Sequence, residues 1–141
     1  MTRAAAVLFA LISMTGASLA DSAEGVWLSE DGGTKVQMSN CGGKLCGTVV
    51  WLKEPNNEKT GKPKTDTLNP DPAQRARPML GLRVVNGMAP SGPDNWAGEI
   101  YNADDGHTYQ ASMKVQGPRT ARVQGCVLGI LCKNQIWKRA N

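Results

Sequence analysis

The chain has 141 residues, which is enough for one domain and too few for two sizeable hydrophobic cores. Its 16 basic and 12 acidic residues give a formal net charge of +4, and these charges are scattered along the sequence. A small, scattered surplus argues against a nucleic-acid-binding protein, in which a clustered basic face is expected.

Residues 1–20 have the features of a secretory signal peptide. An arginine precedes the uninterrupted apolar stretch 4–12, and small residues lead up to Ala20. That stretch is shorter than the ~20 residues that span a bilayer, so a membrane anchor is the less favoured alternative. We expect cleavage between Ala20 and Asp21, and a mature single domain of residues 21–141 that is periplasmic or secreted.

Four cysteines form two close pairs, Cys41 with Cys46 and Cys126 with Cys132. In an exported protein an even number of cysteines favours disulfides, and four cysteines allow three connectivities. Because each close pair lies in an expected hairpin around glycine, we favour the two local bonds. A four-cysteine zinc site is the alternative, but its paired cysteines are usually about two to four residues apart, a spacing that the second pair exceeds. We expect no metal and no cofactor.

Short runs of alternating apolar and polar residues, separated by turn residues, predict an antiparallel all-β protein. Residues 87–95 are rich in Gly and Pro and are expected to form a turn, and Asp105-Gly106 carries a tight hairpin signal. Eight strands joined up-and-down close naturally into a small barrel, which removes exposed sheet edges; a flattened sandwich is the alternative. The eight expected strands are 24–29, 34–39, 44–52, 80–86, 96–102, 107–115, 119–127 and 132–139.

One long loop, residues 53–78, separates the third expected strand from the fourth. Loops of this length in compact domains are commonly functional or disordered. Within it, Asp71 is expected to cap a single helical turn that has Pro72 at its first position.

The same loop concentrates polar side chains in a dozen residues, namely Asp66, Asn69, Asp71, Arg75 and Arg77. In one interpretation, the asparagine and aspartate side chains hydrogen-bond the backbone and an arginine pairs with an aspartate, which orders the loop. In the other, Arg75 or Arg77 is exposed at the barrel mouth and binds a carboxylate or phosphate. Both interpretations stay open at this point.

The two ends of the domain resemble lipocalins. A Gly-x-Trp containing Trp27 lies in the first expected strand, and Arg139 ends the last. In lipocalins the last strand pairs with the first, and a basic side chain packs over the tryptophan ring at the base of the barrel. The resemblance implies that Trp27 is this ring and Arg139 the cation, with Lys138 as a substitute, and we expect Trp137 at the base as well.

Longer strings resemble a secreted bacterial family that is catalogued only as a domain of unknown function and has lipocalin-like members. The resemblance covers essentially all of the expected mature chain and implies a lipocalin-type barrel and an extracytoplasmic location, but no established activity. The family commonly has Lys where His107 stands, which weakens any special role for this histidine. The matching strings are Gly-Val-Trp-Leu-Ser-Glu-Asp-Gly (25–32), Cys-Gly-Gly-Lys-Leu-Cys-Gly (41–47), Asn-Pro-Asp-Pro (69–72) and Ile-Tyr-Asn-Ala-Asp-Asp-Gly-His-Thr-Tyr (100–109).

The side chains favour binding over catalysis. The single histidine, the paired cysteines and the lack of a serine nucleophile motif leave conventional hydrolase chemistry without its parts. An eight-stranded barrel can hold one small ligand, and strict alternation places Val49 and Trp51 on the same apolar inward face. We expect an exported lipocalin-like binding protein for a small apolar or amphipathic ligand; a protein-interaction module that uses the 53–78 loop is the alternative. The candidate ligand-binding residues are Trp51, Trp96, Tyr109, Met113, Arg75 and Arg77.

Overall fold

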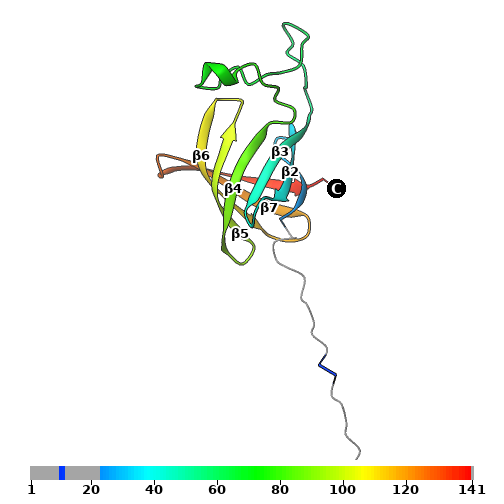
Figure 1. Cartoon of the computed structure of the whole chain (residues 1–141), viewed down its shortest axis with the longest axis vertical. Coiled ribbons are helices and arrows are strands. Elements are labelled where there is room, and N and C mark those ends of the chain that lie inside the picture. Colours follow the sequence, from blue (N-terminus) through cyan, green and yellow to red (C-terminus); the bar gives the residue numbers. More distant parts are fainter. Residues whose placement is uncertain (1–9, 12–22, 141) are drawn as a thin grey trace, which may run out of the picture.

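The computed structural model describes residues 10–11 and 23–140, so the expected signal peptide lies almost entirely outside the described residues. Eight antiparallel strands, each paired with its neighbours in sequence, close into a barrel (Figure 1). The predicted eight-stranded up-and-down barrel is therefore confirmed. The strands are β1 (Gly25–Leu28), β2 (Thr34–Asn40), β3 (Leu45–Leu52), β4 (Arg83–Gly92), β5 (Asn95–Asn102), β6 (His107–Val115), β7 (Thr120–Val127) and β8 (Leu131–Arg139).

The barrel is closed by the pairing of β1 with β8, in which Trp27 lies opposite Arg139. The guanidinium carbon of Arg139 is 4.2 Å from the centroid of the fully buried Trp27 ring. Its nitrogens donate to the carbonyls of Glu24 at 2.7 Å and Pro118 at 2.8 Å. The Trp27 indole donates to the Ala23 carbonyl at 3.0 Å. One cation thus ties the first strand, the last strand and the β6–β7 turn together at this end.

Strand β3 departs from strict alternation near its end. Lys35 on β2 lies opposite Trp51, but the next residue, Val36, lies opposite Val49, so the register shifts by one residue. Such a bulge reverses the faces of the residues that follow it. Trp51 therefore lies outward and is 38% exposed, whereas Leu52 packs against the core. The expectation that Trp51 shares the inward face with Val49 is wrong.

Strand β4 differs from expectation at both ends. It begins only at Arg83, because Gly81 takes a left-handed φ of +88° that interrupts the extended chain. It continues to Gly92 where a turn was expected, and the register shift across Gly87, which has a φ of +89°, accommodates the glycines within the strand. The predicted turn over residues 87–95 is wrong: only residues 93 and 94 connect β4 to β5.

The long loop between β3 and β4 stands above one end of the barrel, opposite the end at which the β4–β5 turn lies (Figure 1). Short bridges, Asn56 with Pro63 and Thr65 with Pro78, order it. It contains the 3₁₀ turn η2 (Pro72–Gln74), and the side chain of Asp71 accepts a hydrogen bond of 3.0 Å from the Ala73 amide. The predicted capped helical turn is therefore confirmed.

No helix within the described residues has the length and apolar character needed to cross a bilayer.

Candidate ligand-binding site

A cavity of about 440 Å³ lies inside the barrel at the end that carries the long loop. Strands β2 to β8 all contribute residues to its lining, together with the β1–β2 and β5–β6 turns. Its volume falls within the roughly 300–1,000 Å³ that small-molecule sites occupy. The apolar part of the wall consists of Val36, Val49, Leu52, Met79, Val84, Ile100, Ala103, Val123 and Trp137.

Trp137 forms part of this wall. Its ring is buried, and its indole nitrogen donates to Gln135, another lining residue, at 3.0 Å. Because Trp137 and Arg139 are two residues apart on β8, they face the same side of the sheet, but Trp137 lies further toward the open end. Trp137 thus lies one inward position from the Arg139–Trp27 closure and also contributes to the cavity wall, and its role in closing the barrel base stays a prediction.

The rim of the cavity is polar. The Tyr109 hydroxyl donates to the carboxylate of Asp105, which also accepts from the His107 amide at 2.8 Å. The hydrogen bond to Asp105, followed by burial, raises the pKa of Tyr109 above its ordinary value of 10.0. Tyr109 is therefore a neutral donor at physiological pH, held in place at the cavity wall.

On the opposite side of the rim, the β1–β2 turn presents Asp31. Its carboxylate accepts from the Gly33 amide at 2.9 Å and from the Ser29 hydroxyl at 2.7 Å. These two hydrogen bonds, with a smaller contribution from the positive charge of Lys133, hold the pKa of Asp31 below its ordinary value. Asp31 and Lys133 both line the cavity, so the mouth carries charges of both signs.

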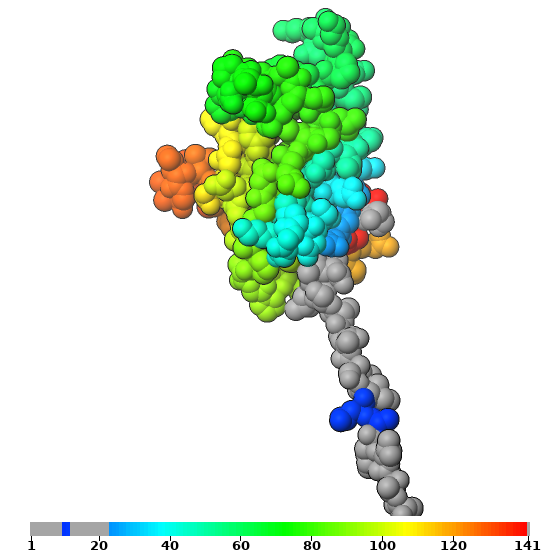
Figure 2. Space-filling view, in the orientation of Figure 1, coloured from blue at the N-terminus to red at the C-terminus, as the bar shows by residue number. Residues whose placement is uncertain are grey.

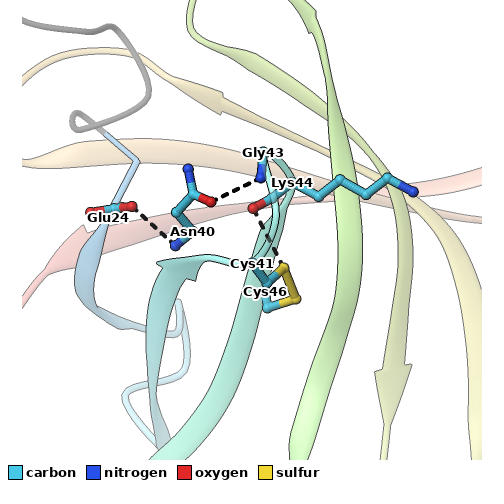
Figure 3. The surroundings of a disulfide bond; sticks show 6 residues. All are labelled: Glu24, Asn40, Cys41, Gly43, Lys44 and Cys46. Carbon is cyan, nitrogen blue, oxygen red and sulfur yellow. Dashed lines mark hydrogen bonds between the residues drawn. A yellow bond between two sulfur atoms is a disulfide. The ribbon is translucent and has the colours of Figure 1, made fainter.

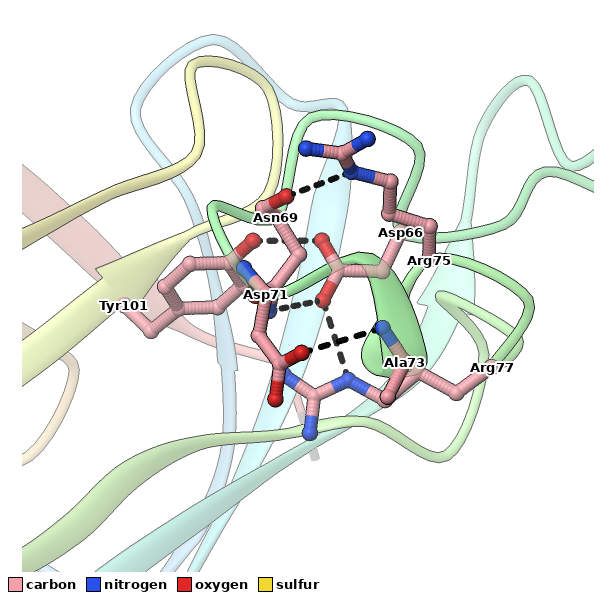
Figure 4. Close-up of polar contacts among 7 residues, drawn as sticks. All are labelled: Asp66, Asn69, Asp71, Ala73, Arg75, Arg77 and Tyr101. Carbon is pink, nitrogen blue, oxygen red and sulfur yellow. Dashed lines mark hydrogen bonds and ion pairs between the residues drawn. The ribbon is translucent and has the colours of Figure 1, made fainter.

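A buried carboxylate fastens the long loop to β5. Asp66 is fully buried, and its carboxylate accepts from the Tyr101 hydroxyl at 2.5 Å, from the Asn69 side-chain Nδ2 at 2.8 Å and from Arg77 Nε at 2.9 Å (Figure 4). Burial raises the pKa of Asp66, but the three donors outweigh burial and hold it below its ordinary value. Asp66 is therefore charged at neutral pH, and Tyr101, which lines the cavity, links it to the barrel.

The other polar residues of the loop bond mainly within the loop. Arg75 Nε donates to the Asn69 carbonyl at 2.8 Å, and the Asp71 amide donates to the Asn69 side chain at 2.9 Å (Figure 4). The Arg77 guanidinium lies 5.7 Å from the Tyr101 ring centroid. These contacts support the interpretation of the motif as a loop-ordering network. Neither arginine is among the cavity-lining residues, and a role for either in ligand binding stays a prediction.

Comparison with known proteins assigns the family. Residues 25–139 match the model of a family described as an uncharacterized protein conserved in bacteria, DUF2147. The chain belongs to this family. No curated protein matches this DUF2147 chain in sequence.

Among solved structures, the DUF2147 barrel is similar to protein HP1028 from the human pathogen Helicobacter pylori, which is described as belonging to the lipocalin family. The TM-score is 0.71 at 22% sequence identity, and the match covers 84% of this chain and 82% of HP1028. At this identity the likeness shows the fold, which is a lipocalin-like barrel.

Of the candidate ligand-binding residues in this DUF2147 protein, Tyr109 alone lines the cavity. Trp51 lies on the outer face, where the Lys35 ammonium is 4.7 Å from its ring centroid. Trp96 and Met113 are buried opposite one another on β5 and β6, outside the cavity lining.

Sequence analysis missed several lining residues of the DUF2147 cavity. Leu52 is reoriented by the bulge, which no local pattern indicated. Lys133 comes from β8 and Asp31 from the β1–β2 turn, which approach each other only when β1 pairs with β8 and the barrel closes. For Trp137 the sequence held one signal: it precedes Arg139 by two residues, which places both side chains on the same face of the last strand.

Both local disulfides are present, and all four cysteines are bonded. Cys41–Cys46 closes the β2–β3 hairpin, where Asn40 accepts from the Gly43 amide at 2.9 Å (Figure 3). Cys126–Cys132 joins facing residues of β7 and β8. Within the described part of the chain, no group of three potential metal ligands occurs. The disulfides thus brace one hairpin at each end of the DUF2147 barrel.

Proposed function

We propose that this DUF2147 protein binds one small apolar or amphipathic ligand inside the barrel. The observation that carries the proposal is the cavity of about 440 Å³, which has an apolar wall and a polar rim. Small-molecule sites combine an apolar lining with a few placed polar groups in this way. The lipocalin-like fold supports small-ligand binding in general.

The two parts of the cavity have different roles in this proposal. Burial of the ligand's apolar body against side chains such as Val84 and Ile100 supplies the affinity. The Tyr109 hydroxyl and the Asp105 carboxylate, which already hydrogen-bond each other, orient a polar end. Tyr101 joins the cavity wall to the long loop through Asp66, so the network in the loop keeps the rim in shape.

The test uses two adjacent valines of β3 that differ in orientation. Val49 is buried and lines the cavity, whereas Val50 is 40% exposed on the outer face. Val49→Trp fills the cavity and is expected to weaken uptake of an apolar fluorescent probe, N-phenyl-1-naphthylamine, by about tenfold or more. The matched control, Val50→Trp, is expected to bind the probe as the unchanged protein does.

The two variants also separate exclusion of the ligand from loss of the fold. Far-UV circular dichroism and the thermal midpoint report whether Val49→Trp keeps a folded barrel. A folded Val49→Trp variant that binds the probe with unchanged affinity would rule out the cavity as the binding site. Native mass spectrometry before and after organic extraction of the natural protein then identifies the class of ligand.

We also propose that the protein is exported, with cleavage after Ala20 and a mature domain of residues 21–141. The two disulfides support this proposal, because such bonds persist mainly in oxidising compartments. The test is the intact mass of the protein recovered from the periplasm and from the medium. A mass that begins at Asp21 with both disulfides formed is expected, and a mass that retains residues 1–20 would contradict the proposal.

The interaction of the 53–78 loop with a protein partner stays a prediction. The polar side chains that would contact a partner include Asp66, which is fully buried, and Asn69, which bonds within the loop. The cavity therefore carries the stronger functional argument.

A further inference from the structure

The hairpin between β7 and β8 ends in four exposed aliphatic side chains. The exposed fractions are 43% for Val127, 87% for Leu128, 80% for Ile130 and 69% for Leu131. Figure 2 shows this hairpin, in orange, projecting from the side of the barrel. Clustered exposed apolar side chains of this kind mark interaction sites more often than isolated ones do.

The shape of this tip, residues 127–131, is fixed by covalent and backbone constraints. The Cys126–Cys132 disulfide closes it at its base, and the Ile130 amide donates to the Val127 carbonyl at 3.3 Å. Leu128 has a φ of +55°, a left-handed conformation that is unusual for leucine. The tip is thus held as a projecting turn in which large apolar side chains stay exposed to water.

The charge of the hairpin is of one sign. From Thr120 to Arg139 the sequence contains four basic residues and no acidic residue, the basic ones being Arg122, Lys133, Lys138 and Arg139. Lys133 directly follows the disulfide and is exposed. Asp31, on the β1–β2 turn, interacts with Lys133 and offsets part of its charge. Of the four, Lys133 is the basic residue beside the apolar tip, whereas Arg122, Lys138 and Arg139 lie toward the opposite ends of β7 and β8.

We propose that the 127–131 tip inserts into the surface of a bilayer that contains anionic lipids. Its side chains are aliphatic and offer no side-chain hydrogen bond, whereas protein interfaces are enriched in aromatic residues and arginine that anchor a partner. The tip is also narrow and projecting, and fluid lipids can rearrange to surround an apolar turn of this shape. The positive charge of Lys133, two residues from the tip, is attracted to anionic headgroups.

Membrane docking goes beyond ligand binding and does not depend on it. The two are linked in space, because Gly125 and Lys133, at the base of the hairpin, also line the cavity. A protein docked through the tip therefore holds the cavity mouth near the lipid surface.

The experiment is co-sedimentation of the chain that begins at Asp21 with lipid vesicles. This chain is used because the apolar stretch 4–12 would itself partition into lipid, and because all eight strands and both disulfides lie between residues 25 and 139. One set of vesicles contains phosphatidylglycerol and phosphatidylethanolamine, and the other contains phosphatidylcholine alone. Binding to the anionic vesicles is expected to be the stronger and to weaken as salt is added.

The double variant Leu128→Ser, Ile130→Ser is expected to lose roughly tenfold or more in partition to the anionic vesicles. The matched control, Leu68→Ser with Leu80→Ser, removes two exposed leucines from the long loop and is expected to bind vesicles as the unchanged chain does. Lys133→Gln is expected to weaken binding to anionic vesicles and to leave binding to phosphatidylcholine unchanged.

Three results would overturn the inference. In the first, the unchanged chain does not sediment with anionic vesicles. In the second, the variant Leu128→Ser, Ile130→Ser sediments to the same extent as the unchanged chain. In the third, the unchanged chain does not bind vesicles but forms a dimer without lipid, and this variant abolishes the dimer. Uptake of N-phenyl-1-naphthylamine by the tip variant separates this inference from the proposed function. Normal uptake together with lost vesicle binding supports the tip as an independent surface.

Discussion

The Asp66 carboxylate accepts a hydrogen bond of 2.5 Å from the Tyr101 hydroxyl, and this contact joins the long loop to a strand that forms the cavity wall. The loop backbone rests on the same side of the barrel: a Cβ added at Gly106, in the β5–β6 turn, would lie only 2.0 Å from the Leu68 carbonyl oxygen. The loop is therefore docked at the rim, and its position affects the shape of the cavity mouth.

The first prediction concerns Asp66→Asn. The substitution keeps the size of the side chain but removes the charge that Arg77 pairs with, and it places an amide donor among the Tyr101, Asn69 and Arg77 donors. Loss of hydrogen-bond partners by buried polar groups costs about 1–3 kcal/mol. We expect the free energy of unfolding in urea to fall by about this amount. Asp71→Asn, at the exposed helical cap, is the control and should cost less, because asparagine caps a helical turn nearly as well.

The second prediction concerns the pH dependence of this contribution. The pKa of Asp66 in the folded protein is below the ordinary value of 3.8, so the folded state favours the charged carboxylate. The contribution of the charged Asp66 carboxylate to the free energy of unfolding is fully present above pH 3.8. It is lost as the pH falls through the lower pKa of the folded state. We expect the difference in unfolding free energy between the unchanged protein and Asp66→Asn to be constant from pH 7 to 5 and to shrink below pH 3.8. A difference that grows toward acid would contradict the assigned direction.

The sequence predicted the barrel because its strands alternate and its turns are marked by Gly, Pro and Asp, and these signals are local. It also predicted the helical cap at Asp71, since Pro72 and the capping side chain are adjacent in the chain. The inward face of β3 could not be predicted in the same way. The bulge at its end depends on pairing with Lys35 and Val36 of another strand, so alternation within β3 placed Trp51 on the wrong side.

The candidate site was predicted less well than the fold for the same reason. Tyr109 keeps the alternation of its strand and was placed correctly on the cavity wall. The depth of each residue along the barrel axis is set by the stagger of the strands, which sequence alternation does not report. Trp96 and Met113 therefore face inward as expected but lie outside the cavity lining. The network of Asp66 with Tyr101 joins residues 35 positions apart, and no local spacing indicated that pair.

The third prediction separates Arg139 from Lys138 in closing the barrel. Arg139 stacks on Trp27 and donates to two carbonyls, whereas Lys138 is exposed. Arg139→Gln is expected to lower the free energy of unfolding by about 1–3 kcal/mol, through loss of the cation–π contact and of the charged hydrogen bonds.

Two further variants complete this test. Arg139→Lys should be intermediate, because a lysine ammonium keeps the charge but cannot reproduce the planar fork of donors. Lys138→Gln is the matched control, with an expected change within about 0.5 kcal/mol. Equal losses from Arg139→Gln and Lys138→Gln, measured by urea denaturation, would show that the stacked geometry does not matter for stability.

The fourth prediction uses the two tyrosines of the chain as reporters of the cavity wall and rim. Burial, followed by the hydrogen bond to Asp66, raises the pKa of Tyr101, and the hydrogen bond to Asp105, followed by burial, raises that of Tyr109. In both cases the folded state favours the neutral phenol. Each contribution to stability is therefore present below pH 10.0 and is lost as the pH rises through the folded-state value.

Ultraviolet titration measures this directly. In the folded protein, tyrosinate absorbance should appear only above pH 10.0, whereas in concentrated urea both tyrosines should titrate near that value. Tyr101→Phe and Tyr109→Phe assign the two steps, since each variant leaves one phenol to titrate. A rise in tyrosinate absorbance at or below pH 10.0 in the folded Tyr101→Phe variant would show that the Tyr109 hydroxyl does not donate a hydrogen bond to Asp105. Tyr109 would then lose its role in orienting the polar end of a ligand.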